Sequence, residues 1–121
     1  MTSKHTLVLG ASTNPNRYSF LAANKLSSFN HPITLVGIKD GNVIGAPILH
    51  SIPSEIKVDT VTVYLSARNQ TGYYNDLIQL KPKRIIFNPG AENPELEKLA
   101  TENGIKVENA CTLVMLSTGQ Y

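Results

Sequence analysis

Several features that define other classes of protein are missing from this chain. It has one cysteine, Cys111, which cannot form an internal disulfide; this agrees with a reducing compartment and favours a small, buried side chain. No run approaches the roughly 20 apolar residues of a membrane span, and the first residues lead directly into a strand-like segment unlike a signal peptide. We therefore expect a cytoplasmic protein with no membrane partner.

Strong charge is also missing. The net charge is only +2 over 121 residues, which is too small to indicate a surface for duplex nucleic acid, so we expect no nucleic-acid partner. The chain is 41% hydrophobic and 17% charged, as in ordinary globular proteins. Its length fits one domain, residues 1–121, without room for a separate substrate domain.

The common catalytic and metal-binding motifs are absent. His5, His31 and His50 are scattered without the spacing of a zinc site, so we expect no metal. There is no Walker A sequence, and Gly10-Ala11-Ser12-Thr13-Asn14 lacks the closing glycine of a nucleophile elbow. The segment after Gly10 also lacks the second and third glycines of the dinucleotide fingerprint GxGxxG, which weakens a standard NAD site. The chain therefore shows no evident catalytic residues of its own.

The pattern of apolar residues indicates a β-α-β chain. Short β-branched runs alternate with helix-like stretches, and continuous apolar character predicts parallel strands that are covered on both faces. We therefore predict an α/β fold, a three-layer, Rossmann-like, doubly wound parallel sheet of about five strands. The predicted strands are Thr6–Leu9, Ile33–Ile38, Val61–Leu65, Arg84–Phe87 and Ile105–Glu108.

Three helices are predicted between these strands. The first has Tyr18, Ala22, Leu26 and Phe29 at helical spacing, and the second has Tyr73, Tyr74, Leu77 and Ile78 inward with Thr71 or Asn69 as its cap and Pro82 beyond its end. The third has Asn93 as its N-cap, Pro94 in its first turn, Leu96, Leu99 and Ala100 inward, and Gly104 at its end. We expect an irregular connection from Asp40 to Asp59 and an added edge strand from Leu113 to Leu116.

The loop after the first strand has the composition of a phosphate-binding loop. In an open parallel sheet, ligands bind beyond the carboxyl ends of the strands. Gly10 permits a tight turn, Ser12 and Thr13 offer hydroxyl groups, and the next helix presents unpaired amides to an anion. Arg17 opposes the helix dipole there, a conflict that an anionic ligand would offset. The alternative is that Ser12, Thr13 and Asn16 only cap the helix.

The residue after the second strand also favours a phosphate. Where an NAD site needs an acidic residue, the chain has Lys39, although Asp40 is adjacent. A lysine suits a ribose-borne phosphate, either the 2′-phosphate of NADP or the 3′-phosphate of coenzyme A. The loops that contain Ser66 and Asn88 follow later strands and complete the expected site. Glu92 could act as an acid or base, or could simply stabilise a helix dipole.

Two stretches, "VLGASTNPNRYSF" and "NPGAENPELEKLATENGIKV", resemble the signatures of small single-domain CoA-binding proteins, Rossmann-like relatives of the CoA-binding domain in the succinyl-CoA synthetase α subunit. The segment from Gly45 to Pro53 also resembles that family's connecting stretch. The resemblance implies a site for coenzyme A or an acyl-CoA across the point where the winding direction changes. Together with Ala11 and Ser66 from the loops, the candidate residues are Gly10, Ser12, Thr13, Asn16, Arg17, Ser19, Lys39, Pro89, Gly90, Ala91 and Glu92.

Three functions are compatible with these observations. The first is a module that binds CoA or an acyl-CoA without chemistry of its own. The second is an NADP-dependent or CoA-processing enzyme subunit that needs a partner chain. The third is a scaffold that keeps the fold but not the ligand, and a homo-oligomer is compatible with each of them.

Overall fold

A seven-stranded sheet forms the centre of the structure, a computed structural model that describes residues 3–121. The strand order is β3-β4-β2-β1-β5-β6-β7, and all neighbouring pairs are parallel except β3 with β4. The predicted Rossmann-like fold is confirmed, with two more strands than the five expected. The strands are β1 Thr6–Leu9, β2 Ile33–Val36, β3 Asn42–Val43, β4 Ala46–Leu49, β5 Thr60–Val63, β6 Arg84–Phe87 and β7 Lys106–Asn109.

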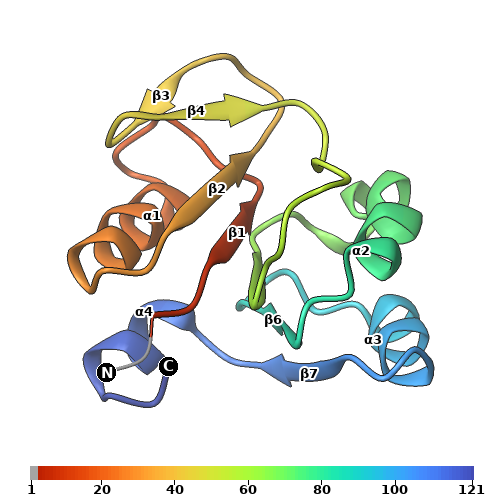
Figure 1. Cartoon of the computed structure of the whole chain (residues 1–121). Coiled ribbons are helices and arrows are strands. Elements are labelled where there is room, and N and C mark those ends of the chain that lie inside the picture. Colours follow the sequence, from red (N-terminus) through yellow and green to blue (C-terminus); the bar gives the residue numbers. More distant parts are fainter. Residues whose placement is uncertain (1–2) are drawn as a thin grey trace.

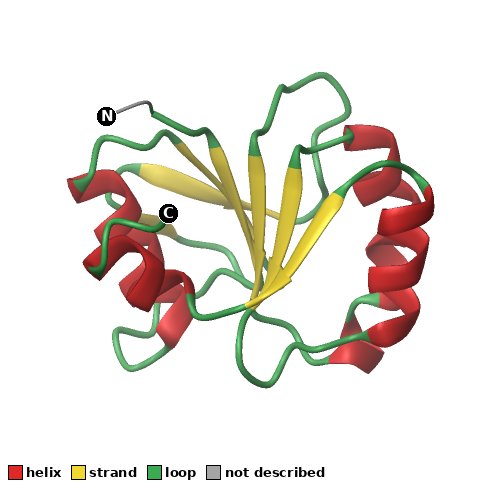
Figure 2. Ribbon diagram, turned by 90° about the horizontal axis from the view of Figure 1, so that it is seen from below, coloured by secondary structure: helices red, strands yellow, loops and turns green. Residues whose placement is uncertain are grey.

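Helices cover both faces of the sheet, so the molecule has three layers (Figure 2). Helices α1 and α4 pack against each other on one face, and α2 and α3 lie together on the other (Figure 1). Two 3-10 turns, residues 67–69 and 71–73, precede α2. The helices are α1 Tyr18–Ser28, α2 Tyr74–Leu80, α3 Pro94–Glu102 and α4 Thr112–Ser117.

Alternation along the central strands builds two separate cores. On β1, Leu7 and Leu9 pack into the core under α2 and α3, while Val8 packs into the core under α1 and α4. All residues of β1 and β5 are buried, as the continuous apolar runs predicted. The strongly buried centre fixes the sheet register, and therefore the relative positions of the loops that follow the strands.

Helix α3 agrees with its sequence signals in detail. The side chain of Asn93 accepts a hydrogen bond from the amide of Leu96 at 3.2 Å, and Pro94 is the first helical residue. Leu96 and Ala100 are buried, and Leu99 packs against the same core. The predicted cap, first turn and inward face are confirmed because every local signal supports the same helix.

The other two predicted helices exist, with corrections. Tyr18, expected on the inner face of α1, is 70% exposed, because the buried face passes through Ser19, Ala22, Ala23 and Leu26. Helix α2 buries Leu77 as expected, but neither Thr71 nor Asn69 caps it. The hydroxyl of Thr71 and the amide of Asn69 donate instead to the carbonyl of Arg68 and the hydroxyl of Ser66.

Two segments were predicted wrongly. The stretch from Asp40 to Asp59 is not entirely irregular, because β3 and β4 form a hairpin and β4 extends the sheet beside β2. The expected edge strand from Leu113 to Leu116 is part of helix α4, whose Leu116 is buried under α1. Cys111, expected to be buried, is half-buried and directly precedes α4.

Predicted strand bounds differ slightly from the observed ones. The first and fourth predicted strands have the observed bounds of β1 and β6. The second ends at Val36 and not at Ile38, and the third and fifth are shifted by one residue or more. The early end of β2 leaves Lys39 in a loop, where it is exposed.

Candidate functional site

The candidate site lies at the carboxyl ends of the parallel strands. The register of β1 with β2 and β5, and of β5 with β6, places the loops after these strands along one edge of the sheet. The chain leaves β1 for α1 on one face and leaves β5 for α2 on the other (Figure 1). The winding direction therefore changes between β1 and β5, which is where open α/β sheets bind ligands.

All the residues predicted for the site lie in these loops or directly after them. The loop after β1 and the start of α1 hold seven of them, and the loops after β2, β5 and β6 hold the others. In that order along the chain they are Gly10, Ala11, Ser12, Thr13, Asn16, Arg17, Ser19, Lys39, Ser66, Pro89, Gly90, Ala91 and Glu92.

The loop after β1 folds back over the end of β2. The amides of Gly10 and Ala11 both donate to the carbonyl of Val36, at 2.8 and 2.9 Å, and Gly10 has a φ of +98°. A residue with a side chain would be strained at this positive φ. Its Cβ would also approach Leu65 to 3.2 Å. The loop that follows is therefore held at a defined height above the sheet.

Short side chains shape the rest of this loop. The hydroxyl of Ser12 accepts from the amide of Asn14 at 3.0 Å, and the side-chain oxygen of Asn14 accepts from the amide of Asn16 at 2.9 Å. None of these side chains reaches the helix, since α1 has no side-chain cap. The alternative that Ser12, Thr13 and Asn16 serve as helix caps is therefore wrong. The first amides of α1 remain available to an anion.

Two exposed cations flank this loop. Arg17 occupies the N-cap position of α1, whose first turn contains no acidic residue, and Lys39 lies in the loop after β2. Among residues 3–121, neither side chain takes part in a salt bridge. The neighbouring carboxylate of Asp40 is paired instead with His50 at 2.6 Å. The edge of the sheet at β1 and β2 therefore carries two cations without a salt-bridge partner among the described residues, next to the exposed carboxylate of Asp40.

The loop after β2 touches the loop after β1 because two glycines allow close contact. A Cβ on Gly37 would lie 2.4 Å from the carbonyl oxygen of Ala11, and one on Gly41 would lie 2.4 Å from Cγ2 of Thr13. Real Cβ atoms do not come so close to other heavy atoms. The two glycines therefore bring Lys39, which lies between them, next to the predicted phosphate loop.

Asn88 joins three elements at the other side of the site. This buried side chain donates to the hydroxyl of Thr62 at 2.7 Å and the carbonyl of Val63 at 2.9 Å, and its oxygen accepts from the amide of Thr112 at 2.9 Å. The amide of Ala91 donates to the Asn88 carbonyl at 2.8 Å. Asn88 thus holds the end of β5, the loop after β6 and the start of α4 together.

The carboxylate of Glu92 has a structural role in the loop after β6. Its Oε1 accepts from the amide of Gly90 at 2.9 Å, so the side chain stabilises its own turn. Glu92 is exposed, and its pairing with a backbone amide accounts for an acidic residue at this position without invoking acid–base chemistry.

Sequence reasoning missed Gln70 as a member of the site's framework. Gln70 is completely buried, and its side-chain amide donates to the carbonyls of Leu65 and Ala91, both at 2.8 Å. These two carbonyls belong to the loops after β5 and β6. No local sequence pattern distinguishes Gln70 from an exposed glutamine, whereas Asn88 directly follows a buried strand and lies in a loop that the sequence predicts as part of the site.

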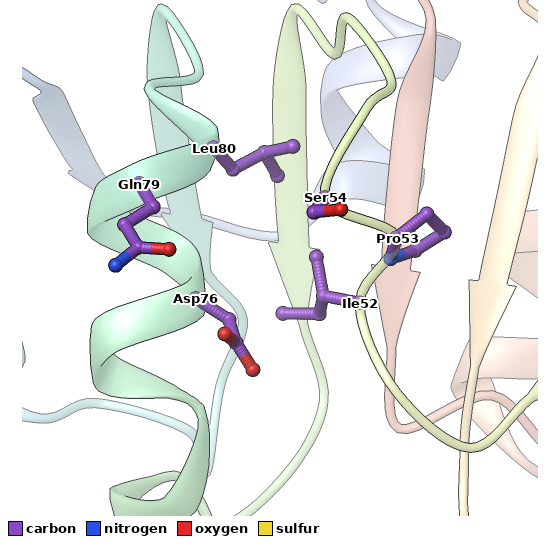
Figure 3. A pocket seen from close by; sticks show the side chains of 6 residues that line it. All are labelled: Ile52, Pro53, Ser54, Asp76, Gln79 and Leu80. Carbon is purple, nitrogen blue, oxygen red and sulfur yellow. The ribbon is translucent and has the colours of Figure 1, made fainter.

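A small cavity lies away from these loops. It has a volume of about 30 Å³ and lies between α2 and the chain that connects β4 to β5 (Figure 3). A water-sized guest fits such a space, but a nucleotide does not. The cavity therefore does not compete with the loops as the candidate site. Its lining residues are Ile52, Pro53, Ser54, Asp76, Gln79 and Leu80.

The described residues contain few other groups suited to chemistry. Burial raises the pKa of Tyr64 to about 12, so its phenol stays protonated near neutral pH. Residues 3–121 contain no group of three or more histidine, cysteine, aspartate or glutamate side chains arranged to hold a metal ion. No helix within the same range is long and apolar enough to span a membrane.

The strand order and the helices on both faces define a doubly wound, Rossmann-like α/β domain. The sequence profile of the CoA binding domain family matches residues 4–117, and the chain belongs to that family. The resemblance noted from the two sequence signatures is therefore confirmed.

Solved structures of similar proteins share the fold of this chain. A crystal structure of a protein described as uncharacterized has 50% identity and a TM-score of 0.96, with complete coverage of both chains. A cell-free expressed protein, ID.343, from Thermus thermophilus has 21% identity and a TM-score of 0.84, covering 98% of this chain and 91% of its own.

A larger enzyme contains a domain of the same fold. It is a dinucleotide-forming acetyl-coenzyme A synthetase 1 from Ca. Korarchaeum cryptofilum, in complex with phosphate and ADP, with 20% identity and a TM-score of 0.70. The match covers 88% of this chain but 25% of the synthetase. None of the curated proteins matches the chain significantly.

Proposed function

We propose that this chain binds coenzyme A, free or as an acyl thioester, at the carboxyl edge of its sheet and has no catalytic machinery of its own. The observation that carries the proposal is the contact between two loops. The loop after β1, which leads to Arg17 and the uncapped start of α1, lies beside the loop of Lys39, because Gly37 and Gly41 allow close contact with Ala11 and Thr13. Membership of the CoA binding domain family supports the identity of the ligand.

The phosphates of CoA would bind at this contact. Backbone amides at the start of α1 and the guanidinium of Arg17 suit the pyrophosphate, since both offer donors to an anion. The ammonium of Lys39 suits the 3′-phosphate on the ribose.

The pantetheine arm would extend from there toward the loop after β6, past Ser66. That loop, Pro89 to Glu92, has an exposed surface at Pro89, Gly90 and Glu92, while Ala91 faces the core. The backbone of Ala91 in this loop is fixed by hydrogen bonds to the carbonyl of Asn88 and from the side-chain amide of Gln70. A fixed loop of this kind can accept hydrogen bonds from the amides of the arm without having to order on binding.

NADP is the second candidate ligand, and Lys39 is the observation that favours it, because a cation after β2 also suits a ribose 2′-phosphate. An NADP-dependent or CoA-processing enzyme would then need residues from a partner chain. If neither nucleotide binds, the chain is a scaffold with the fold alone.

Thermal denaturation with four ligands separates these functions. We expect CoA and acetyl-CoA to raise the melting temperature of the wild type, while NAD and NADP leave it unchanged. At a CoA concentration 100 times the dissociation constant, the expected rise is roughly 10 °C, from about 2.7 kcal/mol of linked stabilisation. A rise with NADP alone supports the enzyme alternative, and no rise with any of the four contradicts nucleotide binding.

Single charge removals test the placement of the phosphates. We expect Arg17→Ala and Lys39→Ala each to weaken CoA binding about 10- to 100-fold, since one charge-assisted hydrogen bond contributes about 1.5–3 kcal/mol. Lys98→Ala is the matched control, because Lys98 is an exposed cation on α3, away from the loops. Equal CoA affinities of all three variants and the wild type would rule out both phosphate assignments.

The proposed domain comprises the whole chain, residues 1–121. We also propose a cytoplasmic location, from the lone cysteine, and a small-molecule ligand as the principal partner. Size-exclusion chromatography with light scattering, with and without CoA, will show whether a second copy of the chain is part of the binding unit.

A further inference from the structure

Gln70 is the largest polar side chain among the fully buried residues of the structure. It lies between the two 3-10 turns that lead from β5 to α2, and none of its surface is exposed. Burying an amide without partners costs free energy, so such a side chain needs hydrogen bonds to neighbouring groups. The partners of Gln70 therefore indicate what holds this part of the molecule together.

The side chain of Gln70 connects two loops of the proposed site. Its Nε2 donates to the carbonyl of Leu65, in the loop after β5, and to the carbonyl of Ala91, in the loop after β6, both at 2.8 Å. One amide group thus uses both of its hydrogens to fix the distance between two segments that are far apart in the sequence. The two carbonyls cannot bond to each other, because both are acceptors, so a donor such as the Gln70 amide is needed to connect them.

Asn93 continues this network toward the helices. Its Nδ2 donates to Oε1 of Gln70 at 2.9 Å and to the hydroxyl of Tyr74 at 2.8 Å, while its oxygen caps α3 through the amide of Leu96. The start of α2, the start of α3 and the two loops are therefore connected by a chain of buried hydrogen bonds. Such a network fixes one arrangement, because other arrangements would leave buried polar groups without partners.

An apolar residue of similar size would fill the same space but would leave the carbonyls of Leu65 and Ala91 without donors. The loop of Ala91 would then have its own internal bonds, from Ala91 to Asn88 and from Gly90 to Glu92, but no side-chain bond to the loop after β5. The expected result is a loop with the same local shape and a less defined position. The loop after β1 packs beside Leu65 at Gly10 but shares no hydrogen bond with this network, since the amides of Gly10 and Ala11 donate to Val36.

We propose that Gln70 is a positioning residue for ligand binding, one that sets the loop Pro89–Glu92 at the height where it meets the pantetheine arm of CoA. This inference rests on the proposed function. Gln70 acts through the backbone of Ala91 and does not itself touch the ligand, because it is completely buried. The nucleotide half of CoA, bound by the loops of Arg17 and Lys39, does not depend on Gln70.

The test compares two ligands. Adenosine 3′,5′-bisphosphate has the 3′-phosphate and the nucleotide of CoA but no pantetheine arm. In Gln70→Met, which keeps the volume and removes both donors, we expect the dissociation constant for CoA to rise about 10-fold, while that for the bisphosphate changes less than twofold. Isothermal titration calorimetry at a temperature well below unfolding measures both constants.

Gln79→Met is the matched control, since Gln79 is exposed on α2 and the same chemical change there leaves the two loops connected. Gln70→Asn is the second variant if Gln70→Met does not fold; it keeps the polar group but is too short to reach both carbonyls, and the same selective loss is expected. An equal loss of both ligands, or no loss of either, would overturn the positioning role. If wild-type protein binds neither ligand, the proposed function itself fails.

Discussion

Gly37→Ala is the substitution that most directly tests the contact between the two phosphate-side loops. Gly37 follows β2, is buried, and its amide donates to the carbonyl of Leu49 at 2.9 Å. A Cβ at this position would lie 2.4 Å from the carbonyl oxygen of Ala11 and 3.1 Å from Cγ2 of Ile48. The nearer neighbour is backbone, which cannot rotate away as a long side chain could.

The size of the effect follows from these distances. To reach even the 3.0 Å limit, the Ala11 carbonyl must move by roughly 0.6 Å, although the amide of Ala11 is fixed to Val36 at 2.9 Å. Overpacking of this kind costs about 1–3 kcal/mol, or roughly 4–12 °C in melting temperature for a domain of this size. Because Ala11 belongs to the phosphate loop, we also expect weaker CoA binding.

Differential scanning fluorimetry without ligand and calorimetry with CoA measure these two effects separately. Gly72→Ala is the matched control: a Cβ there meets nothing within 4 Å and its φ is not positive, so its melting temperature stays near that of the wild type or rises slightly. If Gly37→Ala melts like Gly72→Ala and binds CoA like the wild type, the contact between the two loops has no role in the site.

Two further predictions concern stability. Burial, and then the positive charge of Lys4, lowers the pKa of His31 from its usual 6.5. As the pH falls below 6.5 the unfolded chain therefore takes up a proton before the folded protein does, and the free energy of unfolding should decline by at most about 1.4 kcal/mol per pH unit. Urea unfolding of His31→Asn should show a smaller decline over the same pH range. Asn93→Ala should lower the free energy of unfolding by about 0.5–2 kcal/mol because α3 loses its cap, and by more because Oε1 of Gln70 loses its donor. An unchanged urea midpoint would contradict a stabilising role for these two hydrogen bonds of Asn93.

The parts of the fold that local chemistry determines were predictable from the sequence. Helix α3 has a capping asparagine, a proline at its first position and apolar residues at helical spacing, and these signals together placed it. Strands β1 and β6 are continuous apolar runs between polar turns. Their burial on both faces follows from the rarity of polar residues within them.

Distant contacts determine the parts that the sequence did not reveal. The hairpin of β3 and β4 turns through Ile44 and Gly45, both with positive φ, and an isoleucine there conceals the usual turn signal. Strand β4 exists because Leu35 and Val36 of β2 offer it an edge. The apolar stretch before Leu116 has strand-like composition but forms α4, since it packs on α1.

The candidate site divides in the same way. Its loops could be located from the sequence, because they follow recognisable strands, and their glycines, hydroxyls and cations indicate an anion. The contact between Gly37 and Ala11 could not be predicted from the sequence, because nothing near Gly37 in the sequence shows which backbone segment packs against it. Gln70 was missed for the same reason, since one of the two carbonyls that it bonds, that of Ala91, lies in a loop much farther along the chain.

Binding of coenzyme A at the carboxyl edge of the sheet can be followed by amide chemical shifts in a titration of uniformly 15N-labelled protein. We expect saturable changes concentrated in residues 10–19, 37–41, 66–69 and 89–92, with the largest at the start of α1. Changes confined to the opposite edge of the sheet, around Lys4 and Tyr121, or no changes at millimolar CoA, would contradict binding at the carboxyl edge.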